Sequence, residues 1–245
     1  MSYRRGSAIA VALVLALLIV RTPASLVGYL LPSAVKATGF DGTLWNGEVA
    51  HVEIPLQGQP FAVGRITWAL NPLGLVFGDL IRLQSDWGNQ EADVSISPSI
   101  DGSLAVRRAE VLIDLAWLRE LLPLYIGGQL RADMRSLELS SDGLPTTANG
   151  RVVWQNAAWR AFGGDVSLGS YALDIATSDT GIRANIITLK GALEVDGSVT
   201  IADKRYRIMA NLSGPAARNE AFQQAIAVLA VPDGSGYRIE LSGTL

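Results

Sequence analysis

Few side chains in this sequence have the types and spacing that enzymes use for chemistry. The chain of 245 residues contains a single histidine, His51, and no cysteine. Alternate residues of a strand share a face, so His51 is expected beside Glu53 on the solvent side of a predicted strand rather than as a catalytic base. One histidine and no cysteine exclude a thiol nucleophile, a disulfide framework and a multi-histidine or cysteine metal site.

The other residue types associated with catalysis or cofactor binding are scattered. The sequence has no Gly-x-Ser-x-Gly elbow for a serine nucleophile, and its glycine pairs lack the lysine or helix start of a phosphate site. Asp and Glu occur singly along predicted strands, so their spacing indicates no acid–base pair. Five of the six tryptophans lie in apolar-periodic segments that favour core packing over a sugar platform: Trp45, Trp68, Trp117, Trp154 and Trp159. We therefore expect a protein that is not an enzyme and that uses no cofactor or metal.

Charge is distributed unevenly along the chain. There are 20 Lys and Arg residues against 23 Asp and Glu residues, and 49% of the residues are hydrophobic. The absence of a basic excess argues against nucleic-acid binding. Residues 1–31 contain Arg4, Arg5 and Arg21 and no acid, which leaves 17 basic and 23 acidic residues in 32–245. The N-terminal end is thus basic and apolar, whereas the rest of the chain is acidic.

An uncharged run from Gly6 to Val20 indicates a membrane-directed segment, with two interpretations. In one it is a cleaved signal peptide, with a small-residue site near Thr22–Ala24. In the other it is an uncleaved anchor, with Arg21 reaching the far interface and the second apolar patch, Leu26–Leu31, lying along the membrane or extending the helix. We expect the anchor, because Arg21 and the second patch fit a mature N-terminus poorly. The boundaries are a cytoplasmic stub over 1–5, an anchor and juxtamembrane segment over 6–31, and a β domain over 32–245.

From residue 40 onward the hydrophobic pattern has a period of two. Apolar and polar residues alternate over Leu130–Met134, Leu193–Ile201, Tyr206–Leu212 and Tyr237–Leu241. This alternation is typical of antiparallel strands with one apolar face and one solvated face. The sequence therefore predicts a mainly β protein: one N-terminal anchor helix, then an elongated antiparallel sheet domain with one or two short helices.

Turn and helix signals divide this pattern. Asp-Gly pairs predict turns at Asp101, Asp142, Asp196 and Asp233, although at Asp196 the alternation continues and a bulge fits equally well. A change of phase at Arg135 predicts another bulge. Further expected elements are a turn at Asn71–Gly74, a helix over Leu115–Leu122 that Pro123 ends, and a helix over Ala216–Val231 that Pro215 opens.

Glycine recurs before several apolar-alternating segments. Gly47, Gly64, Gly128, Gly150 and Gly191 each precede such a segment, and we expect each of them to begin a strand. One interpretation is that glycine simply follows turns. The other is a repetitive meander in which each hairpin leans on its neighbour.

Several short motifs follow one another in a fixed order. They are GTLWNG at 42–47, ITWALNPLGL at 66–75, GRVVWQNA at 150–157, LGSY at 168–171 and GYRIELSGTL at 236–245. With one apolar N-terminal segment and no cysteine, this order resembles the type II secretion system protein N family over nearly the whole chain. The residues that carry the resemblance, expected to be structural or interaction residues, are Gly42, Trp45, Gly47, Trp68, Pro72, Trp154, Gly169, Tyr171, Gly236 and Gly243.

The resemblance implies a single-pass protein of the inner membrane, with a cytoplasmic N-terminus and its bulk in the periplasm. Such a protein takes part in the export of folded proteins and has other secretion-system subunits as partners. The glycine-initiated meander is also similar to AsmA-like proteins, which implies as an alternative a carrier of lipid or another hydrophobic ligand in an apolar groove. A cover over the apolar strand faces, such as the Ala216–Val231 helix, favours the scaffold, whereas an open groove favours the carrier.

Overall fold

The architecture of the chain is known from a computed structural model. It describes residues 13–14, 17–56, 59–72, 74, 80–99, 101–115, 126–161, 164–227 and 229–245. The described chain divides into two compact units, Met1–Trp87 and Gly88–Leu245. Both are built mainly of antiparallel strands, as the alternating hydrophobicity predicts.

The first unit consists of a short helical segment and four strands. A 3-10 turn η1 (Ala24–Leu26) runs directly into one helical turn, α2 (Val27–Leu30), and residues 13–14 and 17–20 are also helical. The strands β1 (Lys36–Gly42), β2 (Asn46–Leu56), β3 (Gln59–Leu70) and β4 (Ile81–Trp87) pair antiparallel in chain order. Their core contains Ala24, Val49, Val52 and Trp68, so the segment before the sheet contributes to the core of the sheet.

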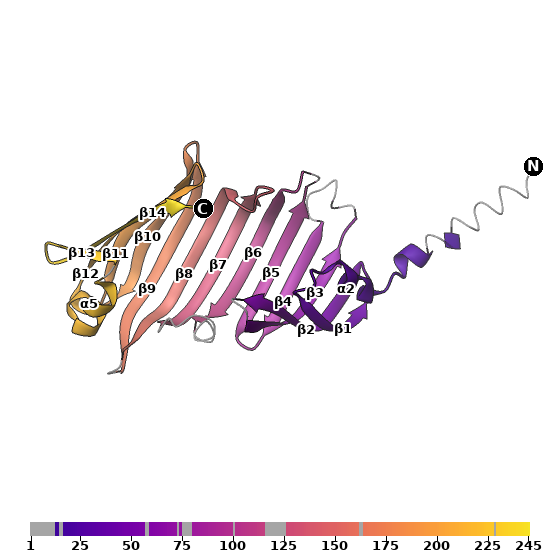
Figure 1. The fold of residues 1–245 in the computed structure, drawn as a ribbon, viewed down its shortest axis with the longest axis horizontal. Helices are drawn as coiled ribbons and strands as arrows, with labels where there is room; N and C mark the ends of the chain where they lie inside the picture. The colour runs from indigo at the N-terminus through magenta and orange to yellow at the C-terminus, as the bar shows by residue number, and fades with distance from the viewer. Residues whose placement is uncertain are drawn as a thin grey trace, which may run out of the picture. The chain divides into compact units, whose positions relative to one another are not determined.

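The second unit is a single antiparallel sheet. Its strands are β5 (Gln90–Pro98), β6 (Leu104–Asp114), β7 (Ile126–Leu139), β8 (Pro145–Ala161), β9 (Gly164–Ser178), β10 (Gly181–Gly191), β11 (Glu194–Ala202), β12 (Arg205–Ser213), β13 (Ala230–Asp233) and β14 (Gly236–Thr244). Strands β5 to β12 are neighbours in chain order, and β14 lies between β12 and the edge strand β13 (Figure 1). From β5 to β12 each strand is therefore the hairpin partner of the next, which is a meander, and β13 and β14 form a final hairpin that joins β12 through β14.

Of the glycines expected at strand starts, Gly47 is the second residue of β2, as expected, but the others lie elsewhere. Strand β7 begins two residues before Gly128 and strand β8 five residues before Gly150, while Gly191 ends β10. Gly128 has φ of +109° and lies where the β7–β8 register shifts: Gly127 pairs with Ala158 but Gln129 pairs with Gln155, so the extra residue of this bulge is on β8. A left-handed backbone of this kind favours glycine. Gly128 and Gly150 thus lie within continuing strands instead of starting new ones.

The helix predicted over Ala216–Val231 is wrong in extent. The structure has a 3-10 turn η2 (Pro215–Arg218), a short helix α5 (Glu220–Ile226) and then strand β13. Asn219 interrupts the helical backbone with ψ of 125°, and its side chain accepts a hydrogen bond from the amide of Phe222 as an N-cap. Pro232 and pairing with β14 then favour an extended backbone beyond the helix.

The described residues before the sheet include no helix that is both long and apolar enough to cross a bilayer. The expected anchor over 6–31 falls partly on residues 6–12 and 15–16, which lie outside the described part of the chain. The helix predicted over Leu115–Leu122 also falls outside it, except for Leu115, which is helical and buried.

The predicted turns have mixed outcomes. The Asp-Gly pairs at Asp101, Asp142 and Asp233 lie in the turns between consecutive strands, and the amide of Gly74 donates to the Asn71 carbonyl at 2.8 Å in the expected turn. The pair at Asp196 is neither turn nor bulge: β11 passes through it in unbroken register with β12. The phase change at Arg135 is a bulge, because the β7–β8 register shifts between Met134 and Ser136.

Candidate functional site

One face of the second unit's sheet is apolar across every strand. A single row of directly paired residues crosses the sheet from one edge to the other. In spatial order it contains Ala92, Val111, Ala132, Val152, Leu173, Ile186, Gly197, Ala210, Ile239 and Ala230. Every member is apolar or glycine, so the alternation seen in single strands is in phase between strands. The face is therefore a continuous apolar surface.

Helical cover lies on this face near one end of the strands. Phe222 of α5 and Ala217 of η2 are 5% and 1% exposed, and they form a buried cluster with Leu168, Leu193 and Leu212. The turn residue Leu193 donates its amide to the Leu168 carbonyl at 3.0 Å, which holds the strand ends together beneath the helix. In Figure 1, α5 lies at the lower ends of β9 and β12. The cover thus protects only part of the apolar face.

Tyr171 is the polar group beneath this cover. Its hydroxyl donates a hydrogen bond to the Leu193 carbonyl at 2.9 Å, and its ring lies 6.0 Å from that of Trp154 between centroids. Burial raises the pKa of Tyr171 to about 12, because the ionised phenolate would lose its hydration.

This pKa shift predicts a loss of stability at alkaline pH. An unfolded tyrosine ionises near pH ~10. The contribution of the buried, neutral Tyr171 to the free energy of unfolding is therefore complete below that pH and is lost as the pH rises toward about 12. We expect the wild-type free energy of unfolding to fall more than that of Tyr171→Phe over this window, measured by urea unfolding at several pH values. Parallel pH profiles for the two proteins would contradict the buried phenol.

Away from the helical cover, the apolar face keeps partial exposure. Leu130, Ala132 and Met134 of β7 and Val152 of β8 are all half-buried, and none of them belongs to the buried cluster. Among the described residues of this unit, no large side chain is fully buried, as such side chains are in an ordinary core. This part of the face resembles a half-covered sheet rather than the inside of a sandwich.

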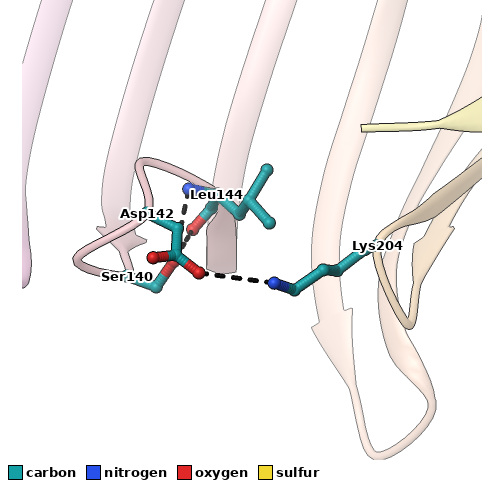
Figure 2. Close-up of polar contacts among 4 residues, drawn as sticks. All are labelled: Ser140, Asp142, Leu144 and Lys204. Atoms are coloured by element: carbon teal, nitrogen blue, oxygen red, sulfur yellow. Dashed lines mark hydrogen bonds and ion pairs between the residues drawn. The ribbon is translucent and has the colours of Figure 1, made fainter.

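A polar contact joins two turns at the opposite rim of the sheet. The Lys204 ammonium of the β11–β12 turn lies 3.3 Å from the Asp142 carboxylate of the β7–β8 turn, as Figure 2 shows. Ser140 exchanges hydrogen bonds with the backbone of Leu144 and closes the turn that presents Asp142. In the sheet, β9 and β10 lie between the strands that carry these two turns. The contact therefore bridges the ends of β9 and β10. The rim is therefore curled.

The curled rim encloses a cavity of about 370 Å³. Its lining includes the apolar side chains of Leu144, Ile182 and Ile201 together with Asp142 and Lys204. Both members of the ion pair are 67% exposed, so the pair contributes little to stability by itself, about 0–1 kcal/mol. The cavity is an apolar recess with a charged border.

The other face of the same sheet is polar and charged. Arg151 of β8 and Asp174 of β9 are directly paired and form a two-bond ion pair, with N–O distances of 2.5 and 2.7 Å. Hydrogen bonding to Arg151 lowers the pKa of Asp174, and the same bond raises the pKa of Arg151. Arg108 also bonds Glu110 two residues along β6. The sheet thus separates an apolar surface from a surface of paired charges.

In the first unit, the GTLWNG motif forms the tight turn between β1 and β2. Gly42 has φ of +84°, and the Thr43 amide and hydroxyl both donate to the Asn46 carbonyl, at 2.9 and 3.3 Å. A Cβ on Gly47 would lie 2.6 Å from Trp68 and 3.0 Å from Ala24. Both glycines are required by close packing, because the turn sits between the N-terminal segment and the sheet.

Trp45 connects this turn to the N-terminal helix. Its indole N–H donates to the carbonyl of Ile19 at 2.8 Å, and the amide of the neighbouring Leu44 donates to the carbonyl of Thr22 at 2.8 Å. Trp45 is half-buried and is not one of the buried core residues of this unit. Its indole instead satisfies a carbonyl in the last turn of the helix.

Replacing Trp45 with phenylalanine is expected to cost about 0.5–1.5 kcal/mol, the net value of one hydrogen bond. The matched change Trp68→Phe should cost more, since Trp68 is 7% exposed and donates to the Leu44 carbonyl from within the core. Urea unfolding of the full chain in detergent, followed by circular dichroism, measures both. Equal losses for the two variants would place Trp45 in the core after all.

The remaining motif residues are distributed over both units. Pro72 is exposed in the turn after β3, whereas Trp154 is half-buried and donates to the Gly127 carbonyl at 3.0 Å. Gly169, Gly236 and Gly243 lie in strands where a Cβ would meet neighbouring atoms at 2.2, 2.1 and 2.7 Å. The structure brings Gly42, Trp45, Gly47 and Trp68 together in one place and Trp154, Gly169 and Tyr171 in another. These two groups are packing sites rather than a catalytic constellation.

The described residues contain no cluster of three or more His, Cys, Asp or Glu side chains suited to a metal ion. His51 lies on β2 with its Nε2 at 3.0 Å from Glu53, and its side chain is 51% exposed. This is the solvent-facing position that strand alternation predicts.

Comparison with known proteins identifies the family. The family model for protein N of the type II secretion system (T2SS) matches residues 33–240. The chain belongs to the type II secretion system protein N family. This membership confirms the resemblance carried by the ordered motifs. No solved structure matches the chain.

Two relatives of the protein N family extend over most of this chain. The type II secretion system protein N of Vibrio cholerae is 27% identical over 221 residues, which cover 84% of this chain and 83% of the relative. The protein of the same name from Aeromonas hydrophila is 25% identical over 241 residues, covering 91% of this chain and 90% of the relative. The similarity therefore includes both units.

Some site features of this protein N family member have no signal in the sequence. Asp142 and Lys204 are 62 residues apart, and each by itself is an ordinary charged turn residue. The bond from Trp45 to Ile19 also joins segments whose contact no local pattern indicates. Leu168 and Phe222, by contrast, fall on apolar positions of alternating or helical patterns, which is the signal that could place them in a core.

Proposed function

We propose that the chain is a non-catalytic, inner-membrane component of the type II secretion system. It takes part in the export of folded proteins across the outer membrane by binding other subunits of the system. The observation that carries this proposal is the family match over residues 33–240, together with an N-terminal segment that is apolar and free of acids. Arg4 and Arg5 remain cytoplasmic under the positive-inside rule, and the bulk of the chain is periplasmic.

The charged face of the second unit supports a binding role. Arg151 and Asp174 form an ion pair at the surface. A charged group of a partner can replace one member of such a pair, so that no unpaired charge is buried on binding. The edge strand β13 supplies a second contact, because it is only four residues long and its Val231 is 69% exposed. Exposed edges are natural docking sites for an added strand.

Loss of secretion on deletion tests the system-level proposal. Removing the gene from its host should reduce export of the proteins that the type II system secretes, and the full chain supplied in trans should restore it. Photo-crosslinking from Arg238, on the charged face beside β13, should capture other secretion-system subunits from intact membranes. Unchanged secretion, with no such subunit captured, would contradict the proposal.

A second candidate function is carriage of a lipid or another hydrophobic ligand. The observation that favours it is the half-buried apolar surface formed by Leu130–Met134 of β7 and Val152 of β8, none of which belongs to the buried cluster around Phe222. The apolar row crosses all ten strands of the unit, long enough to lie along an acyl chain. The cover by the second helical segment is partial: η2 and α5 bury Leu193 and Leu212, whereas Leu130–Met134 of β7 lies outside their cluster.

Neighbouring residues on β8 provide a matched test of the carrier. Val152 lies on the apolar face between Ala132 and Leu173, whereas Val153 points to the charged face opposite Arg131. We expect Val152→Asp to abolish copurification of phospholipid with the gently extracted full chain, and Val153→Asp to retain it, as measured by mass spectrometry of extracted lipid. A wild-type protein free of lipid would exclude the carrier and leave the subunit-binding role.

A further inference from the structure

Apart from the exposed Ser25, the segment Ala24–Leu30, which comprises η1 and α2, is apolar on both of its faces. Its inner face consists of Ala24, Val27 and Gly28, which have the i, i+3, i+4 spacing of one helix side. Ala24 is 1% exposed, Val27 packs against the core of the first unit, and a Cβ on Gly28 would touch the Phe40 ring at 3.3 Å. The sheet therefore fixes the orientation of this segment.

The outer face of the same segment has the same spacing and faces away from the sheet. Leu26, Tyr29 and Leu30 are 44%, 86% and 79% exposed. A helix that is apolar on every side is expected to be covered on every side. The sheet covers one side, so the other requires a partner with an apolar surface.

The neighbouring charges favour a lipid surface as that partner. Residues 1–40 contain Arg4, Arg5, Arg21 and Lys36 and no acidic side chain, so no carboxylate of this region opposes a phosphate headgroup. A single tyrosine beside aliphatic residues is also the composition of a membrane interface, where the ring lies at headgroup level.

The attachment of the N-terminal helix places the segment at the correct depth. Residues 17–20 are helical and are 56–64% exposed, and the helix end is bound to the Trp45 turn through Ile19 and Thr22. Leu26 is six residues after Val20, so the two are separated by at most ~22 Å of extended chain. A helix that enters the bilayer up to Arg21 therefore leaves Ala24–Leu30 at its surface.

We propose that Ala24–Leu30 is an interfacial membrane-binding segment that seats the first unit on the bilayer through Leu26, Tyr29 and Leu30. The inference rests on the proposed inner-membrane location and extends it: the membrane contact includes a second surface, outside the anchor. Trp45 is its positioning residue, because it ties the last helical turn to the same β1–β2 turn that packs on Ala24. The first unit is thereby held at a fixed orientation to the lipid instead of swinging on a tether.

The absence of cysteine in the chain makes a direct test simple. Single-cysteine variants of the full chain, labelled with an environment-sensitive fluorophore, are reconstituted in phosphatidylcholine–phosphatidylglycerol vesicles that contain doxyl-labelled lipids. Tyr29→Cys and Leu30→Cys probe the outer face, and both side chains are exposed enough to be replaced without disturbing the core. Leu18→Cys reports on the N-terminal helix, and His51→Cys on β2 is the control that faces solvent.

We expect the probes at Tyr29 and Leu30 to lose most of their fluorescence to a doxyl group near the headgroup and less to one near the chain end. The Leu18 probe should show the opposite order, and the His51 probe should not be quenched. Quenching at Leu18 but at neither Tyr29 nor Leu30 would overturn the interfacial segment and leave the anchor intact. An unquenched Leu18 probe would instead overturn the proposed membrane location, and the interfacial segment with it.

Discussion

Replacing Phe222 with alanine is expected to lower the free energy of unfolding by about 3–5 kcal/mol, the range for removing a large buried aromatic side chain. Phe222 is 5% exposed and packs into the cluster of Leu168, Leu193 and Leu212. Few other residues cover this part of the sheet, so the cavity left by the ring cannot be filled by a second layer. Urea unfolding of the full chain in detergent, followed by circular dichroism, measures the loss.

Helix α5 also supplies the control. Gln224 lies two residues further along and is exposed, so Gln224→Ala changes the same helix without opening a cavity. We expect its effect to stay within about 0.5 kcal/mol, as for most surface substitutions. A small effect of Phe222→Ala, comparable with that of Gln224→Ala, would show that α5 is not required as a cover and that the apolar face tolerates exposure along its whole length.

The fold class follows from local patterns because the sheet is a meander. Each strand from β5 to β12 pairs with its neighbour in sequence, so the alternation in Leu193–Ile201 and in Tyr206–Leu212 acts on the same face without long-range information. The helix-sized gap in this pattern after Ser213 is also visible in the sequence. Mainly β structure with short helices could therefore be predicted, and it is what the structure has.

Strand lengths could not be predicted from the same patterns. A residue such as Gly128 or Gly169 interrupts the alternation, and from sequence alone an interruption indicates a strand boundary. In the structure both glycines lie inside long strands at irregular pairings, Gly128 in β7 (Ile126–Leu139) and Gly169 in β9 (Gly164–Ser178). Bulges and boundaries give the same local signal, and only the pairing partner distinguishes them.

Some residues of the candidate sites could be placed from sequence patterns, and others could not. Trp68 and Tyr171 are buried where apolar periodicity places them. Apolar periodicity does not indicate the role of Trp45, because its hydrogen-bond partner is the Ile19 carbonyl, in a segment expected to be a membrane anchor. The pair of Asp142 and Lys204 depends on how far the sheet curls, which no residue near either turn encodes. Long-range contacts of exposed residues are thus what sequence patterns omit.

Replacing Gly169 with alanine is expected to be strongly disruptive. Gly169 has φ of +144°, a backbone region that side chains rarely adopt, and its Cβ would lie 2.2 Å from the Lys190 carbonyl oxygen and 2.7 Å from Gly191. Both contacts are to the backbone of β10, which cannot move without breaking the β9–β10 pairing. Backbone strain alone costs about 1–3 kcal/mol, and the steric overlap adds to it.

A second glycine separates the two contributions to this cost. Gly234, in the β13–β14 turn, also has positive φ, of +59°, but nothing lies within 4 Å of its Cβ position. Gly234→Ala therefore reports the backbone term alone, expected at about 1 kcal/mol, whereas Gly169→Ala should exceed it by at least another ~2 kcal/mol or prevent folding. The comparison uses urea unfolding of both variants beside the wild type, with proteolysis of the expressed chain as the readout if Gly169→Ala does not fold. Gly169 is the neighbour of Leu168 and lies two residues before Tyr171, and both of these residues belong to the buried cluster. Equal effects of the two substitutions would therefore mean that the buried cluster does not depend on the close approach of β9 and β10 at this bulge.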